Sequence, residues 1–276
     1  MSMLSRSLAR KAGLAAAVAI LATGGTMAGV AAASASASPA SHPAVAAPSI
    51  DHQLCYTATA QGFKIPANVQ LENQFSTTPF TPEISSVAFH CNPVAKTLPD
   101  GQVFPINYPN DHLLCWNITE SAQPAPMAQV TNQFGTATLA LGQPNFLCLP
   151  SWKSLTGPPV EKTPAPPGLG HFACYPVRVA KGAYKPPPVM LQDEFAPAPV
   201  SAQVNPEPVE LCVPTEKIVN GKVYKIIKSK WNLLCYPVSQ TPIITPVFDK
   251  NQFGKAPVNI DQTSTLCPPS TLKAIG

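Results

Sequence analysis

Cysteine is the residue type in this sequence with the most chemistry to offer, and its spacing is regular. Free thiols are nucleophiles and zinc ligands, whereas paired thiols staple exported domains. The 276-residue chain has eight cysteines and no CxxC pair, which favours disulfides over zinc or redox motifs. Four of them recur at intervals of 60, 59 and 61 residues, each followed by a second cysteine after 36, 33, 38 or 32 residues. The four pairs are Cys55 and Cys91, Cys115 and Cys148, Cys174 and Cys212, and Cys235 and Cys267.

This spacing divides the chain into four units with two cysteines each. The simplest disulfide pairing is therefore within units, although pairing between the two units of one domain stays open. Closing loops of this length stabilises a fold by about 3–4 kcal/mol per bridge. The cysteines are thus expected to be structural, and no catalytic thiol is expected.

Three histidines also recur with the units. His52, His112 and His171 each stand three residues before the first cysteine of their unit. Converging imidazoles would form a zinc site, but equivalent positions in successive units lie far apart. We expect each imidazole to hydrogen-bond a neighbouring strand, and we expect no metal or cofactor.

The most recognisable motif is Asn-Gln-Phe, with one acidic variant. It occurs at 73–75, 132–134 and 251–253, and as Asp193-Glu194-Phe195 in the third unit. Asn and Asp accept hydrogen bonds from nearby backbone in turns, so the motif predicts a turn with Phe anchored in the core. The Asp193 and Glu194 carboxylates would be the candidate dyad of a glycosidase, but no other catalytic signature accompanies them.

Lysines cluster in the fourth quarter of the chain. Lys217 opens the cluster, and the candidate binding residues are Lys222, Lys225, Lys228 and Lys230. Such a patch would hold anionic wall polymers, polysaccharide or lipid headgroups. Lysines that protect an edge strand from aggregation give the same pattern.

The elements that position these residues are predicted to be strands. Apolar residues alternate before the motif, as in Val69 and Leu71, which is the period of a half-buried strand. Asp100-Gly101 and Asn220-Gly221 predict hairpins at 97–110 and 218–230 that join units one to two and three to four. A proline stands two residues after every second cysteine, so the strand should stop or reach an edge there.

Two positions depart from the repeat pattern. Asp249 stands where Leu71 lies in the first unit, and we expect Phe248 to compensate through a local bulge. His90 replaces the leucine that precedes Cys148, Cys212 and Cys267.

The N-terminus reads as an export signal. Three positive charges precede an Ala-rich apolar run that ends in small residues, which is the layout of a signal peptide over 1–37. Residues 38–49 read as a flexible lead-in, and no membrane span is expected after cleavage. The net charge of +4 then falls close to neutral, which argues against a nucleic-acid partner.

These observations predict an all-β protein of two tandem disulfide-bonded β-sandwich-like domains, each made of two units of about 60 residues. The domains cover 50–156 and 170–276, and the proline-dense segment 157–169 links them. Only 12 % of the residues are charged, against about 25 % in typical domains.

The repeated motifs resemble a family of domains in exported bacterial and archaeal proteins, with repeats of the form HLxCY…NQFG…LCVPxxK. Unit two carries the resemblance through His112, Cys115, the motif at 132–135, Cys148 and Lys153. The family has no assigned activity, so the resemblance implies the fold and export but transfers no catalytic residue.

The function expected from the sequence is a secreted, non-catalytic binding or structural module of the cell surface. Its partner is unknown, with a cell-wall polymer or an extracellular protein as candidates. The alternatives are an exported hydrolase of wall or environmental polymers, which would use Asp193 and Glu194, and a secreted protease inhibitor, which would present one of the hairpins.

Overall fold

The regular structure of the described chain is entirely β. The computed structural model describes residues 50–76, 78–120, 126–158, 168–240 and 245–275, which hold eighteen strands. The predicted signal segment and lead-in, and most of the predicted linker, lie outside these residues. Within the described ranges, no helix has the length and apolar character that crossing a membrane requires.

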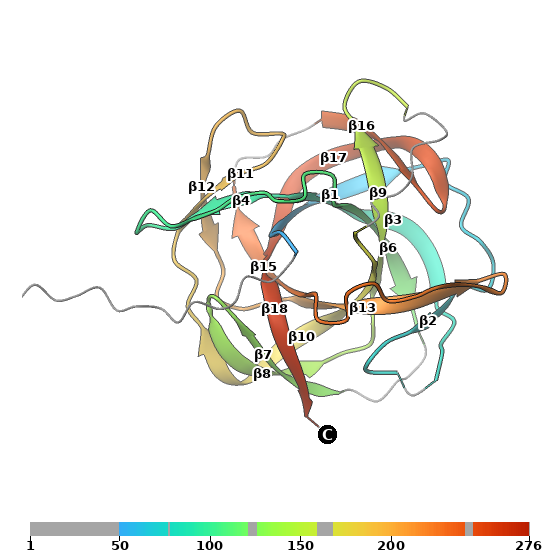
Figure 1. Ribbon diagram of the computed structural model, residues 1–276, viewed down its shortest axis with the longest axis horizontal. Coiled ribbons are helices and arrows are strands. Elements are labelled where there is room, and N and C mark those ends of the chain that lie inside the picture. Colours follow the sequence, from blue (N-terminus) through green and yellow to red (C-terminus); the bar gives the residue numbers. More distant parts are fainter. Residues whose placement is uncertain (1–49, 77, 121–125, 159–167, 241–244, 276) are drawn as a thin grey trace, which may run out of the picture. The chain divides into compact units, whose positions relative to one another are not determined.

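Eight strands, two from each unit, form a closed ring, here called the strand ring (Figure 1). They are β1 (Gln53–Ala60), β3 (Glu83–Pro93), β6 (His112–Thr119), β9 (Phe146–Ser154), β10 (His171–Tyr184), β13 (Glu210–Val219), β15 (Asn232–Ser239) and β17 (Gly254–Cys267). Each pairs antiparallel with the next, and β17 pairs back onto β1. The strand ring therefore has no free edge along these pairings.

Closure of the strand ring joins the two halves of the chain in one sheet. β17 pairs with β1 and β9 pairs with β10, so units one and four meet, as do units two and three. The all-β prediction is confirmed, but two tandem sandwich domains are not shown. The sequence pattern identifies half-buried strands without saying which unit supplies their partners, because every unit carries the same pattern.

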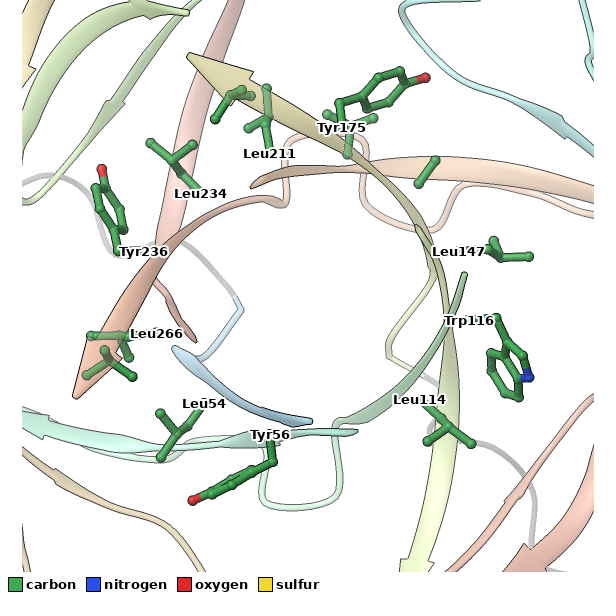
Figure 2. Close-up of a cluster of buried hydrophobic side chains, with 14 of the residues drawn as sticks. Leu54, Tyr56, Leu114, Trp116, Leu147, Tyr175, Leu211, Leu234, Tyr236 and Leu266 are labelled. Carbon is green, nitrogen blue, oxygen red and sulfur yellow. The ribbon is translucent and has the colours of Figure 1, made fainter. Parts of the chain in front are cut away.

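Both faces of the strand ring are buried, for different reasons. Side chains alternate along each strand, so the cysteines point inward and the residues beside them point outward. Figure 2 shows Leu54, Tyr56 and Trp116, with their counterparts in the other units, directed away from the centre of the ring. These outward side chains are almost completely buried, so other elements must cover them.

The remaining ten strands belong to that cover and to two projecting hairpins. They are β2 (Gln70–Glu72), β4 (Ala95–Thr97), β5 (Val103–Phe104), β7 (Met127–Asn132), β8 (Gly135–Leu141), β11 (Val189–Gln192), β12 (Val200–Val204), β14 (Lys222–Tyr224), β16 (Thr245–Asn251) and β18 (Pro269–Ile275). Several pair with strands of other units: β2 with β13, β4 with β11, β7 with β18 and β8 with β10. The cover of one unit is therefore supplied by others.

The prolines after the second cysteines behave as predicted, in two ways. Pro93 ends β3 and Pro269 begins β18, whereas Pro150 and Pro214 lie inside β9 and β13. At Pro150 the pairing with β10 has already ended at Cys148, so this part of β9 is paired only with β6. A proline is tolerated there because the position is locally an edge.

Each disulfide joins the two cysteines of one unit, as the repeat spacing favours. The bonds are Cys55–Cys91, Cys115–Cys148, Cys174–Cys212 and Cys235–Cys267. Each links residues directly opposite one another on neighbouring strands in the first three units. Four such bonds are typical of an oxidising, extracellular-type environment.

Removing one of these bonds should cost much of the stability of the ring. In the double variant Cys174→Ala/Cys212→Ala, the free energy of unfolding is expected to fall by about 3–4 kcal/mol, because a 38-residue separation is no longer cross-linked in the unfolded chain. Urea unfolding measures this change. Ser264→Ala, which alters the same interior without breaking a bond, is the control; an equal loss in both variants would contradict the prediction.

Candidate functional site

The four Asn-Gln-Phe motifs form turns, as predicted. In each, the side-chain oxygen of the first residue accepts a hydrogen bond from the backbone N–H of the phenylalanine two residues on, at 2.8–3.0 Å. Phe134 and Phe253 are buried, and Phe75 and Phe195 are partly buried against the core. The local hydrogen bond fixes the turn, and the phenylalanine anchors it.

The first motif residue also holds the turn to a distant unit. Asn73 donates to the Tyr175 hydroxyl at 2.9 Å, and Asn132 donates to the Tyr236 hydroxyl at 3.0 Å. In the third unit the direction reverses, since the Tyr56 hydroxyl donates to a carboxylate oxygen of Asp193 at 2.9 Å. Each motif therefore docks on the unit two places along the chain.

The phenylalanines repeat this pattern. Each lies edge-on to the aromatic residue that follows the first cysteine of the unit two places away, with ring centroids 5.0–5.4 Å apart. The pairs are Phe75 with Tyr175, Phe134 with Tyr236, Phe195 with Tyr56, and Phe253 with Trp116. The four aromatic residues after the first cysteines are therefore buried by packing between units and are not exposed to a ligand.

The second motif residue reaches the histidine of the preceding unit. Gln133 lies 2.8 Å from His52, and Gln252 lies 3.1 Å from His171. Glu194 lies 3.8 Å from His112. The expected hydrogen bond to a neighbouring part of the chain is confirmed for His52 and His171, whereas His112 Nε2 lies too far from Glu194 for a hydrogen bond. Among the described residues, no group of three potential metal ligands occurs.

Burial keeps these imidazoles neutral. Desolvation is the largest cause that lowers the pKa of His171, to about 3, and the nearby Lys217 lowers it further. The pKa values of His52 and His112 are lowered well below the ordinary value for the same two reasons. A neutral imidazole donates through one nitrogen and accepts through the other.

Three buried lysines complete the junctions between units. Lys96, Lys153 and Lys217 stand five residues after the second cysteine of their units. Their ammonium nitrogens lie over the motif phenylalanines of the next unit, at 4.4–5.1 Å from the ring centroids. Desolvation lowers the pKa of each lysine to about 7.

The role of these three lysines was not predicted from the sequence, and the predicted position of one of them was wrong. Lys217 was predicted to open a surface patch, but its side chain is fully buried. The closing lysine of the LCVPxxK pattern was the available signal. The fourth unit has Leu272 at that position, and its Lys273 is exposed.

Asp193 and Glu194, the candidate glycosidase pair, each bind side chains of other units. Asp193 is buried and accepts hydrogen bonds from Tyr56 and from the Asn92 amide, the latter at 2.9 Å. Glu194 forms an ion pair with Lys153. The two carboxyl groups therefore face separate partners rather than a shared cleft.

His90 and Asp249, two residues that depart from the repeat pattern, lie in one buried hydrogen-bond network. His90 Nδ1 lies 2.8 Å from Asp249 and its Nε2 lies 2.8 Å from Asn92, with both His90 and Asp249 fully buried. Asp249 keeps regular register opposite Lys153 and Ala256, so the predicted bulge at Phe248 is wrong. A polar partner from another unit, rather than a shift of the strand, compensates for the buried carboxylate.

A comparison with protein-family models finds a match to the repeats of this chain. The model described as "Repeat of unknown function (DUF7450)" matches residues 116–268. The chain belongs to this family. No curated protein and no solved structure matches the chain.

The DUF7450 match covers most of three units and the join between the two halves. It begins at Trp116 and ends after Cys267, so it includes the motifs at 132, 193 and 251. The family relationship predicted from these motifs is confirmed. It assigns no activity to any residue.

The interior of the strand ring holds an apolar cavity of about 140 Å³, here called the cystine cavity. All eight cysteines line it, together with side chains two residues before them, including Phe89, Phe146 and Glu210. Neighbouring disulfides approach one another, with 3.8 Å between Cys55 Sγ and Cys267 Sγ. Glu210 is the single ionisable side chain among the lining residues.

Burial in the ring raises the pKa of the Glu210 carboxyl group and leaves one of its oxygens without a hydrogen bond in the part of the chain that the structure describes. One oxygen of Glu210 accepts a hydrogen bond from the Asn145 amide at 2.9 Å, and the other is buried without a hydrogen-bond partner among the described residues. Desolvation is the largest cause that raises the pKa of Glu210, to about 7. Equivalent positions in the other units hold Phe89, Phe146 and Thr265, so aligning the units marks Glu210 as the one charged residue at this position, which is the signal that could have found it.

The predicted hairpins project from the strand ring as two arms. Figure 1 shows the first arm (97–110) and the second arm (218–230) on different sides of the ring. Lys222, Lys225, Lys228 and Lys230 are all exposed on the second arm. None of these four lysines forms an ion pair with a carboxylate in the part of the chain that the structure describes.

The titration of Glu210 predicts a pH dependence of stability. Its folded pKa of about 7 lies above the ordinary 4.5, so the associated stability is present below about pH 4.5 and is lost as pH rises through about 7. Glu210→Gln should therefore lose less stability than the native chain between about pH 5 and pH 8. Thermal unfolding at both pH values measures this, with the exposed Glu207→Gln as control. The prediction fails if both variants follow the native chain.

Proposed function

We propose that this protein is an exported, non-catalytic module that binds an anionic extracellular polymer through the four lysines of its second arm. The observation that carries this proposal is the exposure of Lys222, Lys225, Lys228 and Lys230 on one projecting hairpin. The lysines that serve the core are a separate set, which is buried at the junctions between units.

The chemistry of the arm suits an extended polyanion. An ammonium group is a flexible, strongly hydrated point charge that attracts phosphate, sulfate or carboxylate groups without demanding one geometry. Val223 and Ile227 on the same arm are 44 % and 49 % exposed, so apolar contact can add to charge. A surface of this kind holds polymers that combine anionic groups with apolar backbone.

The first arm provides a natural comparison. It is also a hairpin, although its loop between the paired residues Thr97 and Val103 is longer than the loop between Val219 and Lys222 of the second arm. Val103 is 57 % exposed, yet the first arm carries no lysine between 97 and 110. The proposed binding role of the second arm therefore rests on its four lysines, which the first arm lacks.

Export is the second part of the proposal. Four disulfides fit an oxidising compartment, and the N-terminal segment has the layout of a signal peptide. A rigid disulfide-stapled ring is a suitable support for a binding arm outside the cell, where thiol-reducing systems and chaperones are absent.

Binding to polyphosphate and to dextran sulfate tests the proposal, with uncharged dextran as a reference. The variant with Lys222, Lys225, Lys228 and Lys230 changed to Gln should bind at least about tenfold more weakly, because each lysine near an anionic surface contributes up to about 1 kcal/mol. The native affinity should also fall with added salt.

A matched variant separates the arm from net charge. It changes four exposed lysines elsewhere, Lys64, Lys181, Lys185 and Lys273, to Gln, and it should bind like the native chain. Equal weakening of both variants would reject a site on the arm. Unchanged polymer binding, with self-association of the arm variant alone, would instead assign the lysines to protection of an edge strand.

A further inference from the structure

Lys217 and Gln252 meet across the boundary between the third and fourth units. Lys217 lies on β13, and Gln252 lies in the turn between β16 and β17. The ammonium nitrogen of Lys217 hydrogen-bonds the side-chain carbonyl oxygen Oε1 of Gln252. The carbonyl carbon Cδ is one bond beyond this oxygen, so an amine and a carboxamide are held side by side.

The surroundings make the amine a nucleophile. Lys217 is fully buried, and its nitrogen lies 4.9 Å from the ring centroid of Phe253 and 5.0 Å from that of Tyr224. Removal from water disfavours the ammonium form, and desolvation lowers the pKa of Lys217 to about 7. A substantial fraction of the amine is therefore uncharged at neutral pH, and only the uncharged amine has the lone pair that attacks a carbonyl.

The carboxamide faces a group that can polarise it. His171 Nε2 lies 3.1 Å from Gln252 Oε1. A carbonyl oxygen only accepts hydrogen bonds, so the neutral imidazole donates here. Such a hydrogen bond stabilises the negative charge that develops on the oxygen when a nucleophile adds to the carbon.

We propose that Lys217 and Gln252 join in an intramolecular amide cross-link, which makes this junction a self-modification site. The lysine Nζ adds to Gln252 Cδ, and the bond between Cδ and the carboxamide nitrogen breaks. One proton passes from the lysine amine to the departing nitrogen, which leaves as ammonia. The exchange of one amide for another needs no oxidant, reductant or added acyl donor.

The route for the leaving group is open. The Gln252 side chain is exposed beyond its contact with Lys217, so ammonia released there passes to solvent. The product bond ties β13 to the turn between β16 and β17. It therefore links two units, whereas each disulfide links residues of one unit.

The other three junctions differ in how many of these three residue types, lysine, glutamine and histidine, they contain. Between the first and second units the residue types are the same, namely Lys96, His52 and Gln133, but the amide nitrogen of Gln133 rather than its oxygen lies 2.8 Å from His52. The Lys96 nitrogen and the Gln133 carbonyl oxygen are both buried without hydrogen-bond partners among the described residues. This junction has the composition for the same reaction.

The two remaining junctions lack one or more of its parts. Between the second and third units, Lys153 meets the carboxylate of Glu194 in an ion pair. Between the fourth and first units, Leu272 replaces the lysine, and Asn232 replaces the histidine beside Gln74. Gln74 is therefore an internal control that should stay unmodified.

Peptide mapping by mass spectrometry tests the proposal on the full chain, folded with its four disulfides and then reduced, alkylated and digested with trypsin. The expected product is a peptide pair joining Lys217 to Gln252, lighter than the separate peptides by one ammonia, with no cleavage after Lys217. Complete cleavage after Lys217 together with an intact Gln252 would overturn the proposal.

Two variants test whether Lys217 is the amine that forms the link. Lys217→Arg keeps a cation at the site but cannot form this bond, so it should yield the unlinked peptides. Lys185→Arg, at an exposed position, should leave the link unchanged. A linked mass at Gln252 that persists in Lys217→Arg would assign the modification to another amine and reject the pair.

The polarising role of His171 has its own readout. His171→Asn reproduces the residue found at the fourth junction. During oxidative refolding it should form the link several-fold more slowly than the native chain, although disulfide formation proceeds normally. Equal rates in both chains would overturn the role of His171 as a positioning residue.

Discussion

The pairing of β17 with β1 is the constraint on which the rest of the structure depends. It brings the last ring strand of the fourth unit against the first strand of the first unit, with Gln53 opposite Cys267 and Ala60 opposite Val258. A closed ring of eight strands has room inside for only a few side chains, and the four cystines take that space. The large outward side chains must then be covered from outside. This requirement explains why the motifs of every unit reach to other units.

The same closure explains how the junctions are built. Each motif supplies a residue for the unit two places along and a residue for the unit before it, so the junctions run around the ring and the last unit reaches the first. Hydrogen bonds to other units, such as those of Asn73, Asn132 and Gln252, offset part of the cost of burying polar groups in these junctions. The His90, Asn92 and Asp249 network is the extreme case, since two substitutions that would each be costly alone compensate one another across units.

Much of the local structure was predictable, and the reason is that it depends on short-range physics. Spacing of the cysteines, the Asn-Gly and Asp-Gly hairpins and the motif turns all follow from residues within one unit. The order of units around the ring could not be predicted, because Val69, Val130 and Val189 carry the same pattern and each unit offers equivalent partners. The buried lysines were missed for a related reason: Lys217 resembles its exposed neighbours until the partner unit that covers it is known. Glu210 was missed because a charged residue two places before a cysteine stands out only when the four units are aligned, and its position in the cavity follows only from the closed ring.

The central claim is that the described strands of the four units form one mutually supported ring rather than two independent halves. Differential scanning calorimetry of the disulfide-bonded full chain tests this most directly. Strand pairing across the halves predicts one transition whose calorimetric and van't Hoff enthalpies agree. Two resolved transitions, each with about half of the total enthalpy, would show that the halves unfold separately and would contradict the account.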